Sequence, residues 1–226
     1  MKRSTRVWLA FFVGVCVAGG LAVERYSGVA RSEPIASADV AELLAKVSVV
    51  PEIRPVAGYE RGCRRGQGCV FGPAWQDPTD HSGCDTRNRV LSAQLKDVVY
   101  KPGTRNCKVI AGWVSDPYTG TQITVSQIQI DHTVPLHRAW NAGAWQWSDL
   151  QRRTFANDTR NLLAVSAKAN ESKGDSSLSA WLPDPGTGQQ CPYVLRYLTV
   201  SAAYQLSITA ADRAAAVDAC PKGPLK

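Results

Sequence analysis

Several kinds of residue are scarce in this chain, and their scarcity excludes whole classes of protein. The 226 residues include seven cysteines, three histidines and one methionine. Seven cysteines are fewer than the share of about 8–10% that marks a small disulfide scaffold. Charged residues make up 20% and hydrophobic residues 44%, which excludes a disordered, collagenous or coiled-coil chain. The sequence also shows no internal repeat, helix-turn-helix or zinc finger. It therefore predicts one globular domain with a short additional segment.

Charge is absent from residues 7–23. This apolar run follows Lys2, Arg3 and Arg6, and a basic start before an apolar run is the pattern of a secretory signal. The run is also at the short limit for a membrane-spanning helix. We therefore expect residues 1–26 to be a signal peptide or an N-terminal membrane anchor. Both interpretations place the rest of the chain outside the cytoplasm, either secreted or anchored to the membrane.

The cysteine count agrees with export, because setting aside Cys16 leaves an even number. Reduced thiols or a zinc site are the alternatives to disulfides, although the sequence has no Cys-x2-Cys pair. The pairs that we expect are Cys63–Cys69 as a local loop, Cys84–Cys107, and Cys191–Cys220 between two C-terminal helices.

The positive charge is smaller once the N-terminal segment is removed. The whole chain carries a net charge of +7, but residues 27–226 hold 22 basic and 18 acidic residues, for a net charge of +4. This is a mild bias toward polyanions. By itself it favours nucleic-acid binding only slightly.

Hydrophobic periodicity predicts an α+β chain after a polar linker at residues 27–37. The expected helices cover residues 37–50, 84–98, 148–156, 166–173, 191–206 and 209–219. The expected strands cover residues 108–114, 122–124, 128–131 and 162–165, and a turn at 116–120 makes a hairpin of the first two.

Histidine is the simplest general base near neutral pH, and only His81, His132 and His137 are available. His132 follows Asp131 at the end of the expected strand 128–131. An adjacent acid and imidazole at a strand end can present one group to a metal and the other to water. The alternative is a surface histidine or one that is hydrogen-bonded for structural reasons.

Other polar residues are expected to gather beside this pair. Asn161 opens a short strand, and Asn170 and Lys173 lie one turn apart on the helix expected at 166–173. The order strand, loop, strand and helix would bring these three residues to Asp131 and His132. Such a site is rich in the oxygen ligands that magnesium prefers.

At these residues the chain resembles the HNH endonucleases, whose core is a ββα-metal motif. The matching motifs are Asp-His-x-Val-Pro-Leu at 131–136, Asn-Leu-Leu-Ala-Val at 161–165, Asn-x-x-Lys-Gly-Asp at 170–175 and Trp-Leu-Pro at 181–183. Together they look most like the GmrSD-type C-terminal HNH family, which includes exported bacterial members. The resemblance extends from about Tyr59 to Cys220.

The resemblance implies a role for each residue of the cluster. His132 would be the general base that deprotonates water, and Asp131 and Asn170 would hold a divalent metal. Asn161 would orient His132, and Lys173 would contact the phosphate or the transition state. Asparagine at the third motif position makes this an H-N-N variant, which favours Mg²⁺ or Mn²⁺ over zinc.

Three further residues are candidates for substrate binding. Arg87 and Arg105 lie near cysteines and have the fork geometry that clamps phosphate. A structural pairing with Asp85 is the alternative for these arginines. His137 stands where the family pattern is expected to vary, so it is either a metal or phosphate contact or a surface helix position.

Together these expectations describe a disulfide-stapled α+β protein in which flanking helices and a β-hairpin elaborate the ββα-metal core. Residues 1–26 are the export segment, 27–57 a linker and helix, and 58–226 the nuclease domain with its core motif at 128–175. The expected function is hydrolysis of phosphodiester bonds in DNA by a monomer of low sequence specificity, with RNA as the alternative substrate. A non-catalytic exported protein that binds nucleic acid or the cell envelope is the competing hypothesis.

Overall fold

A computed structural model describes residues 38–220 of the chain. The expected signal peptide or anchor at residues 1–26 and the expected linker at 27–37 lie outside the described residues. Between residues 38 and 220, no helix has both the length and the apolar character needed to cross a membrane.

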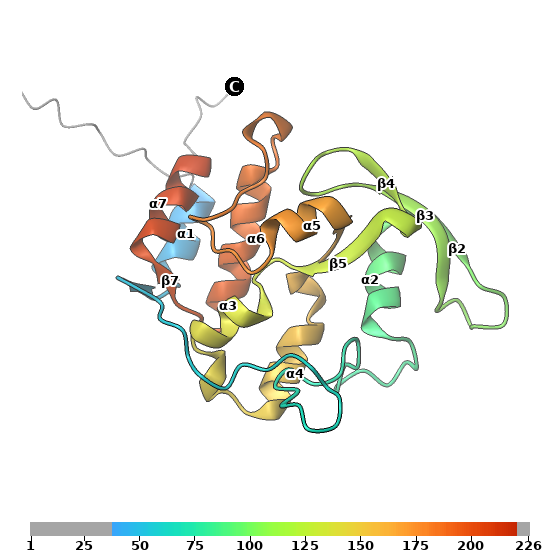
Figure 1. Cartoon of the computed structure of the whole chain (residues 1–226). Helices are drawn as coiled ribbons and strands as arrows, with labels where there is room; N and C mark the ends of the chain where they lie inside the picture. Colours follow the sequence, from blue (N-terminus) through green and yellow to red (C-terminus); the bar gives the residue numbers. More distant parts are fainter. Residues whose placement is uncertain (1–37, 221–226) are drawn as a thin grey trace, which may run out of the picture. The chain divides into compact units, whose positions relative to one another are not determined.

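The described residues form an α+β fold, as expected (Figure 1). Its helices are α1 (Ala38–Ala45), α2 (Thr86–Gln94), α3 (Leu136–Asn141), α4 (Asp149–Asn157), α5 (Ala167–Lys173), α6 (Gln190–Ala203) and α7 (Ala210–Ala219). Its strands are β1 (Val49–Val50), β2 (Lys96–Tyr100), β3 (Val109–Ser115), β4 (Gln122–Thr124), β5 (Ile128–His132), β6 (Leu162–Ser166) and β7 (Ile208–Thr209).

The strands pair in three small sheets. β2, β3 and β4 form an antiparallel sheet, and β5 pairs antiparallel with β6 so that His132 lies opposite Leu162. β1 and β7 form a short parallel pair that joins the two ends of the described chain. α5 follows β6 directly and packs on both β5 and β6 (Figure 1). The end of β5 and the end of α5 are therefore brought together.

Two of the expected helices extend into residues that form strands in the structure. The helix expected at 84–98 ends at Gln94, because the next residues form β2 and pair with β3. β2 contains Val98, Val99 and Tyr100, and β-branched and aromatic side chains favour strands. The helix expected at 37–50 ends at Ala45, and Val49 and Val50 instead form β1.

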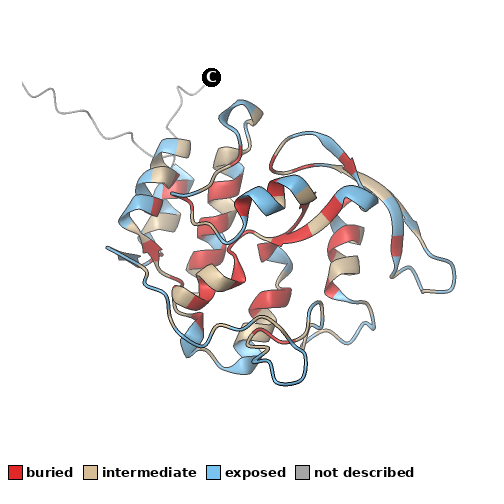
Figure 2. Cartoon of the chain, viewed as in Figure 1, coloured by how far each residue is buried: buried red, intermediate tan, exposed pale blue. Residues whose placement is uncertain are grey.

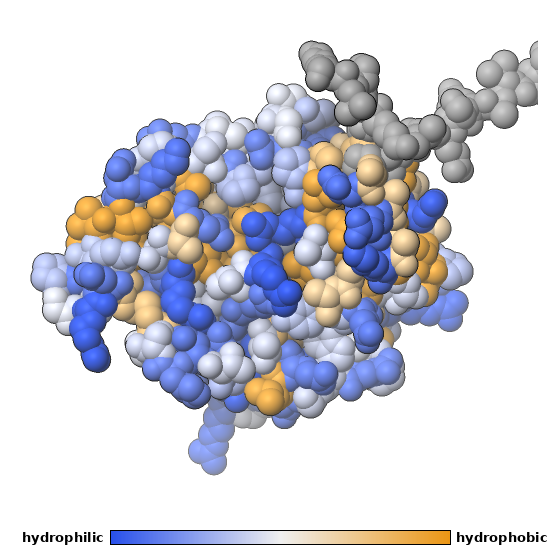
Figure 3. Space-filling model, turned by 180° about the vertical axis from the view of Figure 1, so that it is seen from behind, coloured by the Kyte–Doolittle hydropathy of each residue, from blue (hydrophilic) through white to orange (hydrophobic). Residues whose placement is uncertain are grey.

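The buried hydrophobic residues form two clusters, and Figure 2 colours buried residues red along the chain. The larger cluster lies among α1, α3, α4, α6 and α7, where Phe71 packs against Phe155 and Trp140. The smaller cluster joins α2 to the β5–β6 pair. On the sheet β2–β3–β4, Val99 and Ile110 are exposed, and apolar colour gathers at this side of the molecule, at the left of Figure 3. The β5–β6 pair thus lies between the two clusters.

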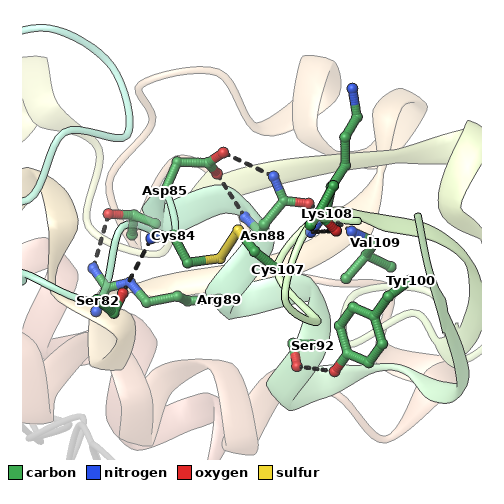
Figure 4. The surroundings of a disulfide bond; sticks show 12 residues. Ser82, Cys84, Asp85, Asn88, Arg89, Ser92, Tyr100, Cys107, Lys108 and Val109 are labelled. Carbon is green, nitrogen blue, oxygen red and sulfur yellow. Dashed lines mark hydrogen bonds between the residues drawn. A yellow bond between two sulfur atoms is a disulfide. The ribbon is translucent and has the colours of Figure 1, made fainter. Parts of the chain in front are cut away.

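The structure contains the three expected disulfides, Cys63–Cys69, Cys84–Cys107 and Cys191–Cys220. Cys84–Cys107 joins the start of α2 to the loop between β2 and β3 (Figure 4). Beside it, the Asp85 side chain caps α2 by accepting from the Asn88 backbone N–H, and Asn88 Oδ1 accepts from the Val109 backbone N–H at 2.9 Å. A covalent bond and a hydrogen bond therefore tie the same helix to the same sheet.

Candidate active site

Asp131 and His132 end β5 and line one open surface pocket of about 290 Å³. Adjacent residues on a strand point to opposite faces, yet both of these residues reach the pocket because the chain turns directly after β5 toward Pro135 and α3. The other lining residues are Tyr59, Arg61, Pro135, Leu136, His137, Gly174 and Asp175.

The imidazole of His132 is held in one tautomer. Its Nε2 lies 2.9 Å from the backbone carbonyl oxygen of Ala156. Because a carbonyl oxygen only accepts, Nε2 carries the proton and Nδ1 keeps its lone pair. Burial lowers the pKa of His132 to about 4, although the contact with Ala156 opposes this shift. The ring is therefore neutral at neutral pH, and Nδ1 is its basic nitrogen.

Asp131 is buried and held on both of its carboxylate oxygens. Lys173 Nζ lies 3.0 Å from Oδ1, and Tyr118 Oη lies 2.5 Å from Oδ2. Burial raises the pKa of Asp131, while the ammonium of Lys173 opposes that rise. An ionised carboxylate offers about four acceptor positions, so these bonds leave Asp131 some capacity for a ligand in the pocket.

Lys173 lies beneath the pocket, where its side chain has no exposed surface. Its ammonium also donates to the backbone carbonyl oxygen of His132 at 2.9 Å. The family resemblance implied that Lys173 contacts the phosphate or the transition state, and in this structure its ammonium is bonded to Asp131 and to the His132 carbonyl. A charged residue is costly to bury without a partner, and Asp131 is that partner.

Asn161 fixes the turn that follows His132. Its side chain accepts from the Val134 backbone N–H at 2.8 Å and donates to the Val134 carbonyl oxygen at 3.1 Å. The Asn161 backbone carbonyl accepts from the Thr133 N–H at 2.8 Å. Asn161 is fully buried, so water does not compete for these hydrogen bonds.

Asn170 is not among the residues that line the pocket. Its Nδ2 donates to Gln129 Oε1 at 2.6 Å, which leaves the amide oxygen as the group that could meet a cation. Between residues 38 and 220, no group of three or more His, Cys, Asp or Glu side chains is placed to hold a metal. The carboxylate of Asp131 and the amide oxygen of Asn170 are hard oxygen donors that suit Mg²⁺ or Mn²⁺, and of the two residues only Asp131 lines the pocket.

The structure separates the three candidates for substrate binding. His137 lines the pocket, and its Nδ1 lies 2.5 Å from Asp175 Oδ2. Arg87 instead donates to the backbone carbonyl oxygen of Ile128 at 3.2 Å. Arg105 is exposed in the loop between β2 and β3. Neither arginine lines the pocket.

Sequence reasoning missed Tyr59, Arg61 and Tyr118. Tyr59 and Arg61 belong to the irregular stretch after α1 and before α2, where no periodicity indicates direction. Tyr118 lies in the turn between β3 and β4 but is 1% exposed. The only signal in the sequence for the burial of Tyr118 is that it is a large aromatic residue within a polar turn.

This arrangement places an acid and a neutral imidazole in one open pocket, at the end of a strand pair covered by a helix, as suits a hydrolytic site. Residues 85–216 match the family model for the C-terminal domain of GmrSD restriction endonucleases. The match covers more than half of the chain. The chain therefore belongs to this family, which is a family of nuclease domains.

One relative is similar over most of its length. It is an "Uncharacterized secreted protein" of the fungus Arthroderma benhamiae (strain ATCC MYA-4681 / CBS 112371), with 36% identity over 185 residues. The aligned part covers 80% of this chain and 83% of the relative. No solved structure matches the chain.

Proposed function

We propose that this protein is an exported, metal-dependent HNH endonuclease that hydrolyses phosphodiester bonds in DNA. The observation that carries the proposal is His132: its Nε2 is bonded to the Ala156 carbonyl, its ring is neutral, and it lines an open pocket beside Asp131. The neutral ring leaves the lone pair of Nδ1 available to take a proton. Membership of a nuclease family supports nucleic acid as the substrate.

The reaction begins with water bound in the pocket. Nδ1 of His132 takes a proton from the water while the oxygen of that water forms a bond to phosphorus. The bond from phosphorus to the 3′ oxygen breaks, which gives a 5′-phosphate and, after protonation of the leaving oxygen, a 3′-hydroxyl. General-base catalysis of this kind contributes about 10²–10⁴-fold to the rate.

Asp131 and Asn170 would hold the divalent cation, Mg²⁺ or Mn²⁺, in the ββα arrangement of β5, β6 and α5. When bound, it supplies Lewis-acid stabilisation of the charge that develops on the phosphate and the leaving oxygen. Lys173 is a positioning residue in this proposal, because it fixes the Asp131 carboxylate and the His132 carbonyl. Asn161 is a second positioning residue, because it fixes the two residues after His132.

Other observations support the proposed substrate and location. The described residues contain no dedicated base-reading motif, so the phosphate backbone is the expected handle, which gives low sequence specificity. Three disulfides suit an extracytoplasmic protein, and the fungal relative is named as secreted. RNA is the alternative substrate to DNA.

The test is digestion of plasmid and single-stranded DNA by the disulfide-bonded protein, with Mg²⁺, with Mn²⁺ and with a chelator. His132→Ala is the test variant, and His81→Ala is the matched control because His81 is exposed in a loop. We expect cleavage that needs metal and His132 and does not need His81. If folded His132→Ala cleaves DNA at the normal rate, the assignment is wrong. If the folded wild-type protein is silent with both metals, the non-catalytic binding hypothesis takes its place.

A further inference from the structure

The active-site pocket is completed by residues that the family match does not cover. The match spans residues 85–216, but Tyr59 and Arg61 also line the pocket. They belong to the stretch of residues 56–72, which we call the arginine segment. This segment has no helix or strand of its own, but the Cys63–Cys69 disulfide and the hydrogen bond from the Val70 N–H to the Glu60 carbonyl oxygen stabilise it from within.

The arginine segment is fixed to α3, the helix that begins just after the Asp-His turn. The Val56 backbone N–H donates to Asn141 Oδ1 at 2.8 Å, and the Val56 carbonyl accepts from Trp140 Nε1 at 3.1 Å. The ring of Tyr59 stacks on the ring of His137, with centroids 4.5 Å apart and planes 23° apart. α3 therefore holds the arginine segment and also begins at the turn that follows His132.

Arg61 projects from this segment with its side chain partly ordered. Its Nη1 donates to the Gly72 carbonyl oxygen at 2.9 Å, which uses one of the five N–H donors of the guanidinium. Gly72 has a φ of +71°, and a Cβ there would lie 2.6 Å from the Arg153 side chain. This backbone carbonyl is therefore held at a position that few other residues allow.

Arg61 shares the pocket with the carboxylates of Asp131 and Asp175, which are paired with Lys173 and His137 instead. No ion pair between residues 38 and 220 includes Arg61. By contrast, Arg138 pairs with Asp212 at 2.7 Å, and Arg89 pairs with Asp77 at the same distance. A guanidinium that lacks a carboxylate but lines a pocket with a general base is suited to an anionic ligand.

We propose that Arg61 binds a phosphate group of the nucleic-acid substrate beside the scissile bond, so that the arginine segment is part of the active site. The proposal rests on the proposed nuclease function. The planar fork of arginine donates to two phosphate oxygens at once, which orients the phosphate as well as attracting it. His137 and Asp175 form the adjoining wall, because they bond to each other and His137 supports Tyr59.

The experiment compares Arg61→Ala and Arg61→Lys with a matched control in the disulfide-bonded protein. Arg54→Ala is the control, because Arg54 precedes the arginine segment and lines a different pocket, where its side chain is 83% exposed. The first readout is kcat and KM on a DNA oligonucleotide. The second is DNA binding against salt concentration in the His132→Ala background, where cleavage does not interfere.

We expect Arg61→Ala to lower kcat/KM by about 10–100-fold, the range for losing a charge-assisted hydrogen bond. It should also reduce the slope of log affinity against log salt by about one, because one phosphate contact is lost. Arg61→Lys should restore the salt slope but not the full rate, because an ammonium is a point charge without the fork. Arg54→Ala should match the wild type.

Two outcomes overturn the proposal. In one, the wild type cleaves but Arg61→Ala keeps a kcat/KM within about twofold of Arg54→Ala and the same salt slope. In the other, Arg61→Lys loses as much cleavage rate and as much salt slope as Arg61→Ala, and both variants unfold at a lower temperature than the wild type. That result would show that Arg61 has a structural role. If the wild type does not cleave at all, the proposed function fails, and the salt slope alone then decides whether Arg61 binds phosphate.

Discussion

The side-chain amide of Asn161 makes two hydrogen bonds to the backbone of Val134, one through each of its polar atoms. Asparagine has a donor and an acceptor at the spacing that a peptide unit presents, so it closes this contact as a paired strand would. Because Val134 lies two residues after His132, the contact sets the path of the chain directly after the proposed base.

Replacement of Asn161 by alanine should lower the free energy of unfolding by about 2–4 kcal/mol, because it leaves a buried N–H and C=O of Val134 unpaired. Cleavage should fall as well. Urea unfolding measures the first effect, and DNA digestion the second. Asn170→Ala is the matched control for stability, because Asn170 is partly exposed and makes one side-chain bond. Equal stability losses in the two variants would contradict the role given to Asn161.

Replacement of Lys173 by methionine should lower the unfolding free energy by about 3–5 kcal/mol, because it leaves Asp131 buried without its cation. Adding Asp131→Asn should restore much of that stability without restoring cleavage, and a double-mutant cycle measures the coupling. Lys168→Met is the control, because Lys168 is exposed on the same helix. A Lys173→Met protein as stable as the control would refute the importance of the buried pair.

Removal of the disulfide Cys84–Cys107, as Cys84→Ala with Cys107→Ala, should cost about 3 kcal/mol, given a sequence separation of 23. The same change at Cys63–Cys69, with a separation of 6, should cost about 2 kcal/mol. Chemical denaturation with and without a reducing agent measures both. We expect the reduced protein to lose activity, because the Cys84–Cys107 bond supports the contact of α2 with the sheet. Full activity of the reduced protein would contradict that expectation.

Stability should fall in acid through Asp212. Burial raises the pKa of this carboxyl, but hydrogen bonds from the N–H groups of Ser179 and Thr209 lower it by more. The net result is a pKa of about 2, compared with an ordinary value of 3.8. The folded state therefore binds the proton less tightly than the unfolded state. The stabilisation is complete above pH 3.8 and is lost as the pH falls toward about 2. Its size is roughly 2 kcal/mol.

Asp212→Asn should therefore reduce the pH dependence of stability between pH 4 and 2, and it should lower stability at neutral pH because Asp212 also pairs with Arg138. Unfolding measured at several pH values tests this, with Asp218→Asn on the exposed face of the same helix as the control. An unchanged acid limb in Asp212→Asn would show that another group carries the effect.

The sequence predicted those helices and strands that are long enough to show a regular pattern of hydrophobic and polar residues. β5, β6 and α5 lie where alternation and the Asn170–Lys173 spacing indicated. No range was predicted for α3, because its six residues are too few to show a helical period. The strand β2 was assigned to a helix, because its stability comes from pairing with β3, which local pattern does not record.

The sequence predicted some of the residues that line the pocket but not others. Asp131 and His132 line one pocket, yet the burial of Lys173 could not be foreseen, because a lysine is normally exposed. Arg61 could not be found either, because it comes from a segment 70 residues before Asp131 in the chain and is positioned by Gly72. Such long-range placement depends on the tertiary fold.

The short parallel pairing of β1 with β7 has a consequence for where the domain can be cut. β1 lies before the region of the family match, whereas β7 lies inside it. A fragment trimmed to residues 85–216 would lose β1, the buried Phe71 and the helix α1 that packs on α6 and α7. We therefore expect residues 85–216 alone to be less stable than the whole domain, and the same cut would remove Arg61 from the pocket.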